Sequence, residues 1–146
     1  GFLKLGLYSE LARKDIVKAR DYISRKKLEA NDDNIREFRE TIFSGKELKI
    51  QSLIHTPDFY TLSSCRDLCF HTQEHRFTID QLNKTLKYNK LKFLGFCLPQ
   101  PIKSLYKEYF PEDPNQTNLY NWAKFEEKHP NTFAGMYQFW VCKAKI

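Results

Sequence analysis

The sequence predicts an α+β domain in which a small three-stranded sheet is covered by several helices. Three short apolar segments, residues 2–8, 91–98 and 134–143, are the expected strands. The first places three leucines on one face, the second is apolar on both faces, and the third is rich in aromatic and β-branched residues. The intervening segments carry apolar residues at helical spacing, so helices should pack against this sheet.

Length and composition favour one domain over residues 1–146, with a helical insert at about 10–88. The 146 residues are 41% hydrophobic and 29% charged, which is typical of a globular chain with a real core. No apolar run is long enough for a membrane span, so no membrane is expected as a partner. Much of the net charge of +6 is spread around the first predicted helix. This distribution favours a solvated surface, and we expect no nucleic-acid partner.

The helices before residue 60 are bounded by capping residues. Ser9 is the expected N-cap of a helix over residues 10–28, because a serine hydroxyl can accept a hydrogen bond from the first turn. Asp32 or Asp33 should cap a second helix that ends at Ser44 and Gly45. A shorter helix is expected over residues 46–55, before Pro57.

The second half of the chain alternates helices with the remaining strands. Helices are expected over residues 79–88, 100–110 and 119–128. Pro99 and Pro101 should end the middle strand, and residues 111–118 form a loop by composition.

The segment 58–78 holds the densest set of reactive side chains. A helix over residues 62–75 would place Leu62, Cys65, Leu68, Cys69 and Thr72 on one face. The opposite face would carry Asp67, His71, Glu74 and His75. A helix that buries the first set would direct this carboxylate–imidazole cluster towards a cleft or towards water.

The four cysteines indicate a reducing compartment. Cys65, Cys69, Cys97 and Cys142 all lie among apolar residues, and no two form a C-x-x-C pair. Buried free thiols are the favoured interpretation, so a cytoplasmic location is expected.

Several segments resemble the C-terminal part of a class I S-adenosylmethionine-dependent methyltransferase. FLKLGLYSELAR resembles the fifth strand of that fold, LKFLGFCL the sixth, and TFAGMYQFWVCK the seventh. DFYTLSSCRDLCFHTQEHRFTIDQL resembles the segment on the substrate side. The likeness is greatest to the methyltransferase domains attached to tetratricopeptide-repeat proteins. It implies a partial Rossmann-like fold with strand order first–last–middle and an antiparallel last strand.

The cofactor-binding part of that family has no counterpart here. The five glycines, at positions 1, 6, 45, 95 and 135, are too far apart to form the glycine-rich turn. Backbone N–H groups at such a turn and at a helix N-terminus hold this type of ligand. The resemblance therefore implies S-adenosylmethionine for a complete parent protein, no cofactor bound by this chain alone, and no activity of the chain by itself.

Candidate residues for a substrate cleft follow from the strand end and from the segment 58–78. Ligands of open α/β sheets sit outside the carboxyl ends of the strands, which selects Tyr8 and Ser9. The segment 58–78 adds Tyr60, Arg66, Asp67, His71, Glu74 and His75. No single catalytic residue stands out, and simple packing remains an alternative for Tyr8.

Two other functional hypotheses remain open. One is a non-catalytic helical module that binds another protein. The second, less favoured, is a zinc hydrolase, because residues 71–75 match the H-x-x-E-H sequence. On a helix, His71 and His75 could share a zinc ion and Glu74 could act as a base. No glutamate follows Glu127 to complete that ligand set, so we expect no metal site.

The first strand should be an unprotected edge. In the complete fold a further strand would flank residues 2–8, and this chain has no segment assigned to that place. Unpaired edges with apolar residues tend to pair with another chain. We therefore expect a homo-oligomer formed through this N-terminal edge strand.

Overall fold

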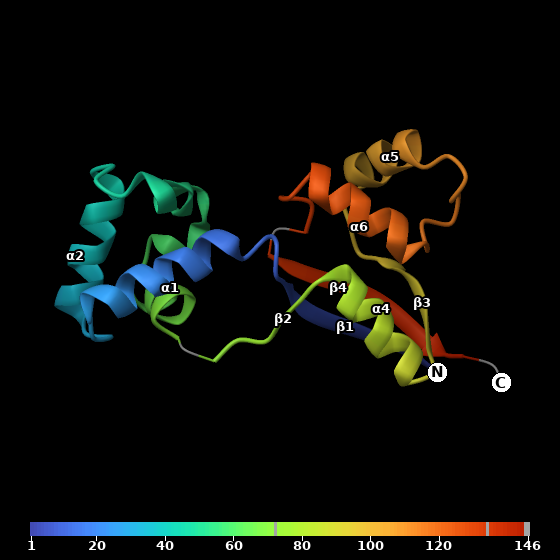
Figure 1. The fold of residues 1–146 in the computed structure, drawn as a ribbon, viewed down its shortest axis with the longest axis horizontal. Coiled ribbons are helices and arrows are strands. Elements are labelled where there is room, and N and C mark those ends of the chain that lie inside the picture. Colours follow the sequence, from blue (N-terminus) through green and yellow to red (C-terminus); the bar gives the residue numbers. More distant parts are fainter. Residues whose placement is uncertain (72, 134, 145–146) are drawn as a thin grey trace. The chain divides into compact units, whose positions relative to one another are not determined.

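The computed structural model describes residues 1–71, 73–133 and 135–144. The chain separates into two compact units (Figure 1). The sheet unit comprises Gly1–Ala12 and His75–Ile146, and the helical unit comprises Arg13–Glu74. Each unit has a hydrophobic core of its own.

The sheet unit is built on a four-stranded mixed sheet in the order β2-β1-β4-β3. Its long strands are β1 (Phe2–Ser9), β3 (Leu91–Phe96) and β4 (Met136–Lys143). β4 is antiparallel to both of its neighbours, β1 and β3. The predicted α+β class is confirmed, and so is the order of the first, last and middle strands.

The predicted number of three strands is wrong, because β2 (Arg76–Phe77) adds a fourth. It pairs in parallel with the end of β1, where Tyr8 aligns with Arg76 and Ser9 with Phe77. Two residues are too few to show strand periodicity. The pairing depends on where the chain returns after the helical unit, which no local pattern specifies.

Three helices complete the sheet unit: α4 (Ile79–Tyr88), α5 (Gln100–Tyr109) and α6 (Leu119–Lys128). The bounds of α4 and α6 are those predicted, and α5 ends one residue early. α4 begins with a capping box, in which Thr78 and Gln81 bond each other's backbone N–H groups. Asn118 caps α6 by accepting hydrogen bonds from Tyr120 and Asn121.

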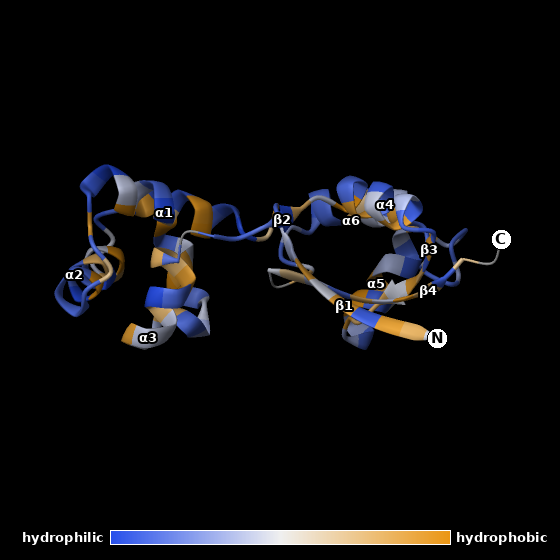
Figure 2. Cartoon of the chain, turned by 90° about the horizontal axis from the view of Figure 1, so that it is seen from below, coloured by the Kyte–Doolittle hydropathy of each residue, from blue (hydrophilic) through white to orange (hydrophobic). Residues whose placement is uncertain are grey.

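The core of the sheet unit lies between one face of the sheet and its helices (Figure 2). Tyr137, Phe139 and Val141 of β4 are fully buried on this face. Trp122 of α6 stacks on Tyr106 of α5, with ring centroids 3.8 Å apart. Large rings therefore fill the core, in line with an aromatic content of 15%.

The helical unit begins with α1 (Lys14–Lys26) and α2 (Asp32–Phe43). It continues through the 3₁₀ turns η1 (Leu48–His55) and η2 (Pro57–Phe59). It ends with α3 (Leu62–Cys65) and the π-helical turn η3 (Arg66–Phe70). Phe38 is almost completely buried in its core and contacts the rings of Phe59 and Phe70. In the described part, no helix is long and apolar enough to cross a membrane.

Two capping predictions in this unit are wrong. α1 is preceded by Arg13 rather than capped by Ser9, whose hydroxyl is directed into the sheet unit. Asn31, not Asp32 or Asp33, caps α2 by accepting a hydrogen bond from the Asn34 N–H. Asn31 has the extended backbone that an N-cap requires, whereas Asp32 and Asp33 already lie in the helix.

The helix predicted over residues 62–75 is also wrong beyond Phe70. His71 has an extended backbone, and Gln73–His75 are outside any helix. Thr72, expected on the buried face, lies outside the described residues. Glu74 instead contacts Arg13 and Arg20, so tertiary ion pairing prevails over local helical spacing here.

Candidate functional site

The carboxyl end of β1 leads to a buried polar cluster of Ser9, Glu126 and Tyr137. Ser9 donates a hydrogen bond to Glu126 Oε1 at 2.5 Å, and Tyr137 donates to Glu126 Oε2 at 2.7 Å. The Ser9 hydroxyl oxygen also accepts from the Ala12 N–H at 3.1 Å. All three side chains belong to buried residues. The cluster therefore links the β1 end to α6 and β4.

Burial has the largest effect on the titration of this cluster. Burial raises the pKa of Glu126 above its ordinary value, although the hydrogen bonds from Ser9 and Tyr137 oppose this shift. Burial also raises the pKa of Tyr137, so its phenol stays a donor. Ser9 and Tyr137 are fully buried, which favours a structural role for the cluster at the strand end.

Tyr8 is the more accessible residue at this strand end. Its side chain is half-buried, and its backbone aligns with Arg76 of β2 and Met136 of β4. Arg76 in turn binds Glu10, with Nε 3.0 Å from Oε2. These residues form a polar margin where β1 leaves the sheet.

Glu74 is the centre of an ion-pair cluster inside the helical unit. Its carboxylate lies 2.6 Å from Arg13 Nη2 and 3.0 Å from Arg20 Nη2, and its side chain is only 4% exposed. Arg20 also donates to the Leu68 carbonyl at 2.8 Å. Burial raises the pKa of Glu74, but the two guanidinium groups more than offset this and leave the pKa below its ordinary value.

The remaining candidates of segment 58–78 either bind other residues or are exposed. Arg66 binds Asp32 at 2.6 Å, and the Tyr60 hydroxyl donates to the Ile54 carbonyl at 2.6 Å. Asp67, His71 and His75 are exposed. Tyr8, Ser9 and His75 belong to the sheet unit, whereas the others belong to the helical unit.

The metal interpretation loses its geometric basis. It required His71 and His75 one turn apart on a helix, and that helix ends at Phe70. Glu74, its expected base, is held by two arginines. Across residues 1–71, 73–133 and 135–144, no cluster of three or more His, Cys, Asp or Glu residues could hold a metal ion.

Of the cysteines, Cys65 and Cys69 are buried, while Cys97 and Cys142 are half-buried. The Cys65 thiol is hydrogen-bonded to Cys69, and this bond together with burial raises the pKa of Cys69. The same hydrogen bond lowers the pKa of Cys65. Both thiols are buried, so the pair is suited to packing.

Sequence reasoning missed Glu126, Tyr137, Arg13 and Arg20. A signal existed for Glu126, which lies four residues after Trp122 and so shares its buried helix face. The arginines gave no such signal, because their partner Glu74 lies more than fifty residues away in the sequence.

No protein-family model matches this chain, and the search of curated proteins finds no match either.

Proposed function

We propose that this chain forms the C-terminal, acceptor-facing part of an S-adenosylmethionine-dependent methyltransferase and is inactive by itself. The observation that carries the proposal is the strand arrangement β1-β4-β3, in which the last strand of the chain inserts antiparallel between two earlier strands. The sequence resemblance implies this arrangement for strands five, seven and six of that fold. Tyr8, at the carboxyl end of β1, is where a ligand of such a sheet would lie.

The residues of this chain do not fit the cofactor on their own. In the described part, the glycines after Gly1 lie within β1 and β3, after α2, and before β4. None of them forms a strand–turn–helix junction that presents backbone N–H groups to the donor. A separate cofactor-binding segment must supply that turn if methyl transfer takes place.

Calorimetric titration of S-adenosylmethionine into this chain is expected to give no binding heat. Repeating the titration with the polypeptide encoded upstream of Gly1 included should produce saturable binding, because the glycine-rich turn is then present. Saturable binding to the chain alone would contradict the assignment of the cofactor site. An upstream sequence without a glycine-rich strand–turn–helix would remove the basis for methyl transfer.

We further propose that the chain self-associates through β1. The short strand β2 pairs only with Tyr8 and Ser9, and no described residue pairs with the rest of that edge. Phe2 and Leu3 are 76% and 52% exposed. A second copy offers the same unpaired N–H and C=O groups, so two β1 strands can complete each other's edge.

Leu3→Lys is expected to convert the assembly to a monomer, because a lysine on an edge strand opposes strand pairing. Leu48→Lys is the matched control, since Leu48 is 79% exposed and lies in the helical unit. Sedimentation equilibrium should report a halved mass for the first variant alone. A wild-type chain that sediments as a monomer, or an equal effect of both variants, would refute association through β1.

A further inference from the structure

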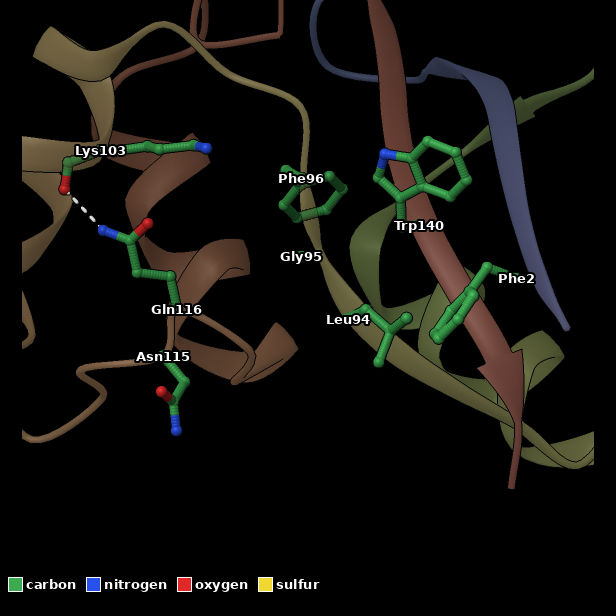
Figure 3. Close-up of a pocket in the computed structure, with 8 residues that line it drawn as sticks. All are labelled: Phe2, Leu94, Gly95, Phe96, Lys103, Asn115, Gln116 and Trp140. Atoms are coloured by element: carbon green, nitrogen blue, oxygen red, sulfur yellow. Dashed lines mark hydrogen bonds between the residues drawn. The ribbon is translucent and has the colours of Figure 1, made fainter. Parts of the chain in front are cut away.

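A hollow of about 490 Å³ lies beside β3 in the sheet unit (Figure 3). Its two sides differ in chemistry. One side is apolar and consists of Phe2, Leu94 and Trp140. The other is polar and consists of Lys103, from α5, and Asn115 and Gln116, from the loop before α6. The volume is in the range that holds a drug-sized molecule.

Gly95 leaves room beside the indole of Trp140. The register of β3 against β4 shifts between Phe93 and Gly95, so Leu94 is the additional residue of a bulge and Gly95 aligns with Trp140. Gly95 has φ +142°, which residues with side chains rarely adopt, and an added Cβ would meet no heavy atom within 4 Å. The space beside Gly95 is therefore open, and bulges of this kind are frequent next to binding sites.

The polar side is held in place by its own hydrogen bonds. Gln116 has φ 56°, and its side-chain Nε2 donates to the backbone carbonyl of Lys103 at 2.7 Å. The backbone carbonyl of Gln116 accepts from Trp122 Nε1 at 2.9 Å. The Asp113 carboxylate accepts from the Tyr106 hydroxyl and from the backbone N–H groups of Thr117 and Asn118. The loop is therefore ordered before a ligand arrives, which lowers the entropy cost of binding.

The charged side chain in the lining of the hollow is that of Lys103. Among the residues that the structure describes, no aspartate or glutamate lines it. The described residues include no ion pair that involves Lys103. Lys4 aligns with Trp140 across the β1–β4 ladder and is exposed, which adds a second cation on this face of the sheet. Trp140 itself is 44% exposed, so its ring face is accessible for stacking.

We propose that this hollow binds a planar aromatic ligand that carries a phosphate or a carboxylate. The ring stacks on Trp140 beside Gly95, the anionic group binds the Lys103 ammonium, and the amides of Asn115 and Gln116 hydrogen-bond the ring substituents. The site is independent of the proposed methyl transfer, because it uses none of the residues at the carboxyl end of β1.

The test uses the whole chain and three probes: adenosine 5′-monophosphate, indole-3-acetate and uncharged adenosine. Two-dimensional ¹H–¹⁵N NMR separates the indole N–H signals of the chain's two tryptophans. Binding should shift the Trp140 signal saturably and leave that of Trp122, which is bonded to Gln116, closer to its free position. The phosphate and carboxylate arms decide which anion the site prefers.

Trp140→Ala is expected to lower the affinity for each probe about tenfold, in line with the loss of one stacked ring. Because that variant removes its own reporter, its affinities are read from the backbone N–H signals of Leu94 and Gly95. Lys103→Gln should lower the affinity for the two anions to that for adenosine, and the affinity for adenosine should stay unchanged. Lys107→Gln on the same helix and Tyr120→Ala, an aromatic residue that is 61% exposed, are the matched controls.

The inference is overturned if neither anion produces a saturable shift, or if both anions bind no more tightly than adenosine. It is equally overturned if Lys107→Gln lowers the affinity for the two anions as much as Lys103→Gln does. If Trp140→Ala fails to fold, Trp140→Leu supplies the same test with the volume of the side chain largely kept.

Discussion

Glu74→Ala is expected to lower the free energy of unfolding of the helical unit by about 3–5 kcal/mol, because it leaves two partly buried guanidinium groups without their carboxylate. Glu74 is 4% exposed, and the Arg13 and Arg20 side chains are 13% and 16% exposed, so water replaces the lost partner poorly. Hydrogen exchange of the α1 and η3 amides, read by mass spectrometry, measures the loss in this unit separately from the sheet unit.

The matched control is Asp33→Asn, which removes an exposed i,i+3 pair with Arg36. Exposed pairs of this kind contribute about 0–1 kcal/mol, so this variant should exchange almost like the wild type. Equal protection in the two variants would show that the Glu74 cluster does not stabilise the unit.

The same carboxylate gives the helical unit a predictable acid sensitivity. The pKa of Glu74 is lower in the folded chain than its ordinary value. The contribution of ionised Glu74 to the free energy of unfolding is therefore fully present above the pKa that this group has in the unfolded chain. It is lost as the pH falls through the folded pKa. Glu74→Gln should remove this part of the pH dependence. If the stability of the helical unit falls with pH in the same way in this variant as in the wild type, the prediction is contradicted.

Glu126→Ala is expected to cost the sheet unit about 3–5 kcal/mol, because the buried hydroxyls of Ser9 and Tyr137 lose their acceptor and a cavity remains. Glu126→Gln keeps the shape and can accept from Tyr137 while it donates to Ser9. Glu127→Gln is the control, since Glu127 is the exposed neighbour on the same helix. Denaturant unfolding followed by tryptophan fluorescence should rank Glu126→Ala far below the other two variants.

The pH dependence of Glu126 has the opposite sign to that of Glu74. Its pKa is raised in the folded chain, so the neutral carboxyl's contribution is fully present below the unfolded pKa and is lost as the pH rises through the folded pKa. The wild type should therefore lose stability relative to Glu126→Gln as the pH rises from about 4 towards neutral. If the free energy of unfolding varies with pH in the same way for the two proteins, ionisation of Glu126 does not destabilise the sheet unit.

Where prediction from sequence succeeded, the signal was local. α4 has both a capping box and a clear apolar stripe of Ile79, Leu82 and Leu86, and its bounds are those predicted. β4 is rich in aromatic and β-branched residues, and its bounds, Met136–Lys143, lie within the predicted segment. Its predicted first residue, Ala134, lies outside the described residues.

Prediction failed where distant residues decided the outcome. Spacing alone extended a helix to His75, but Glu74 pairs with Arg13 and Arg20 and the helix ends at Phe70. Ser9 has the side chain of an N-cap, yet its hydroxyl binds Glu126 from the other end of the chain. In both cases a buried polar group needed a partner, and that requirement outweighed a local preference of about 1 kcal/mol.

The sequence by itself determined the α+β class, the long strands and the bounds of α4 and α6, because apolar spacing and capping residues act over a few positions. Only the tertiary structure decided the fourth strand, the carboxylate clusters around Glu74 and Glu126, and the hollow between Trp140 and Lys103. These features join residues far apart in the chain, and the free energy that selects them, from burial, ion pairing and hydrogen bonding, exists only once the units have folded.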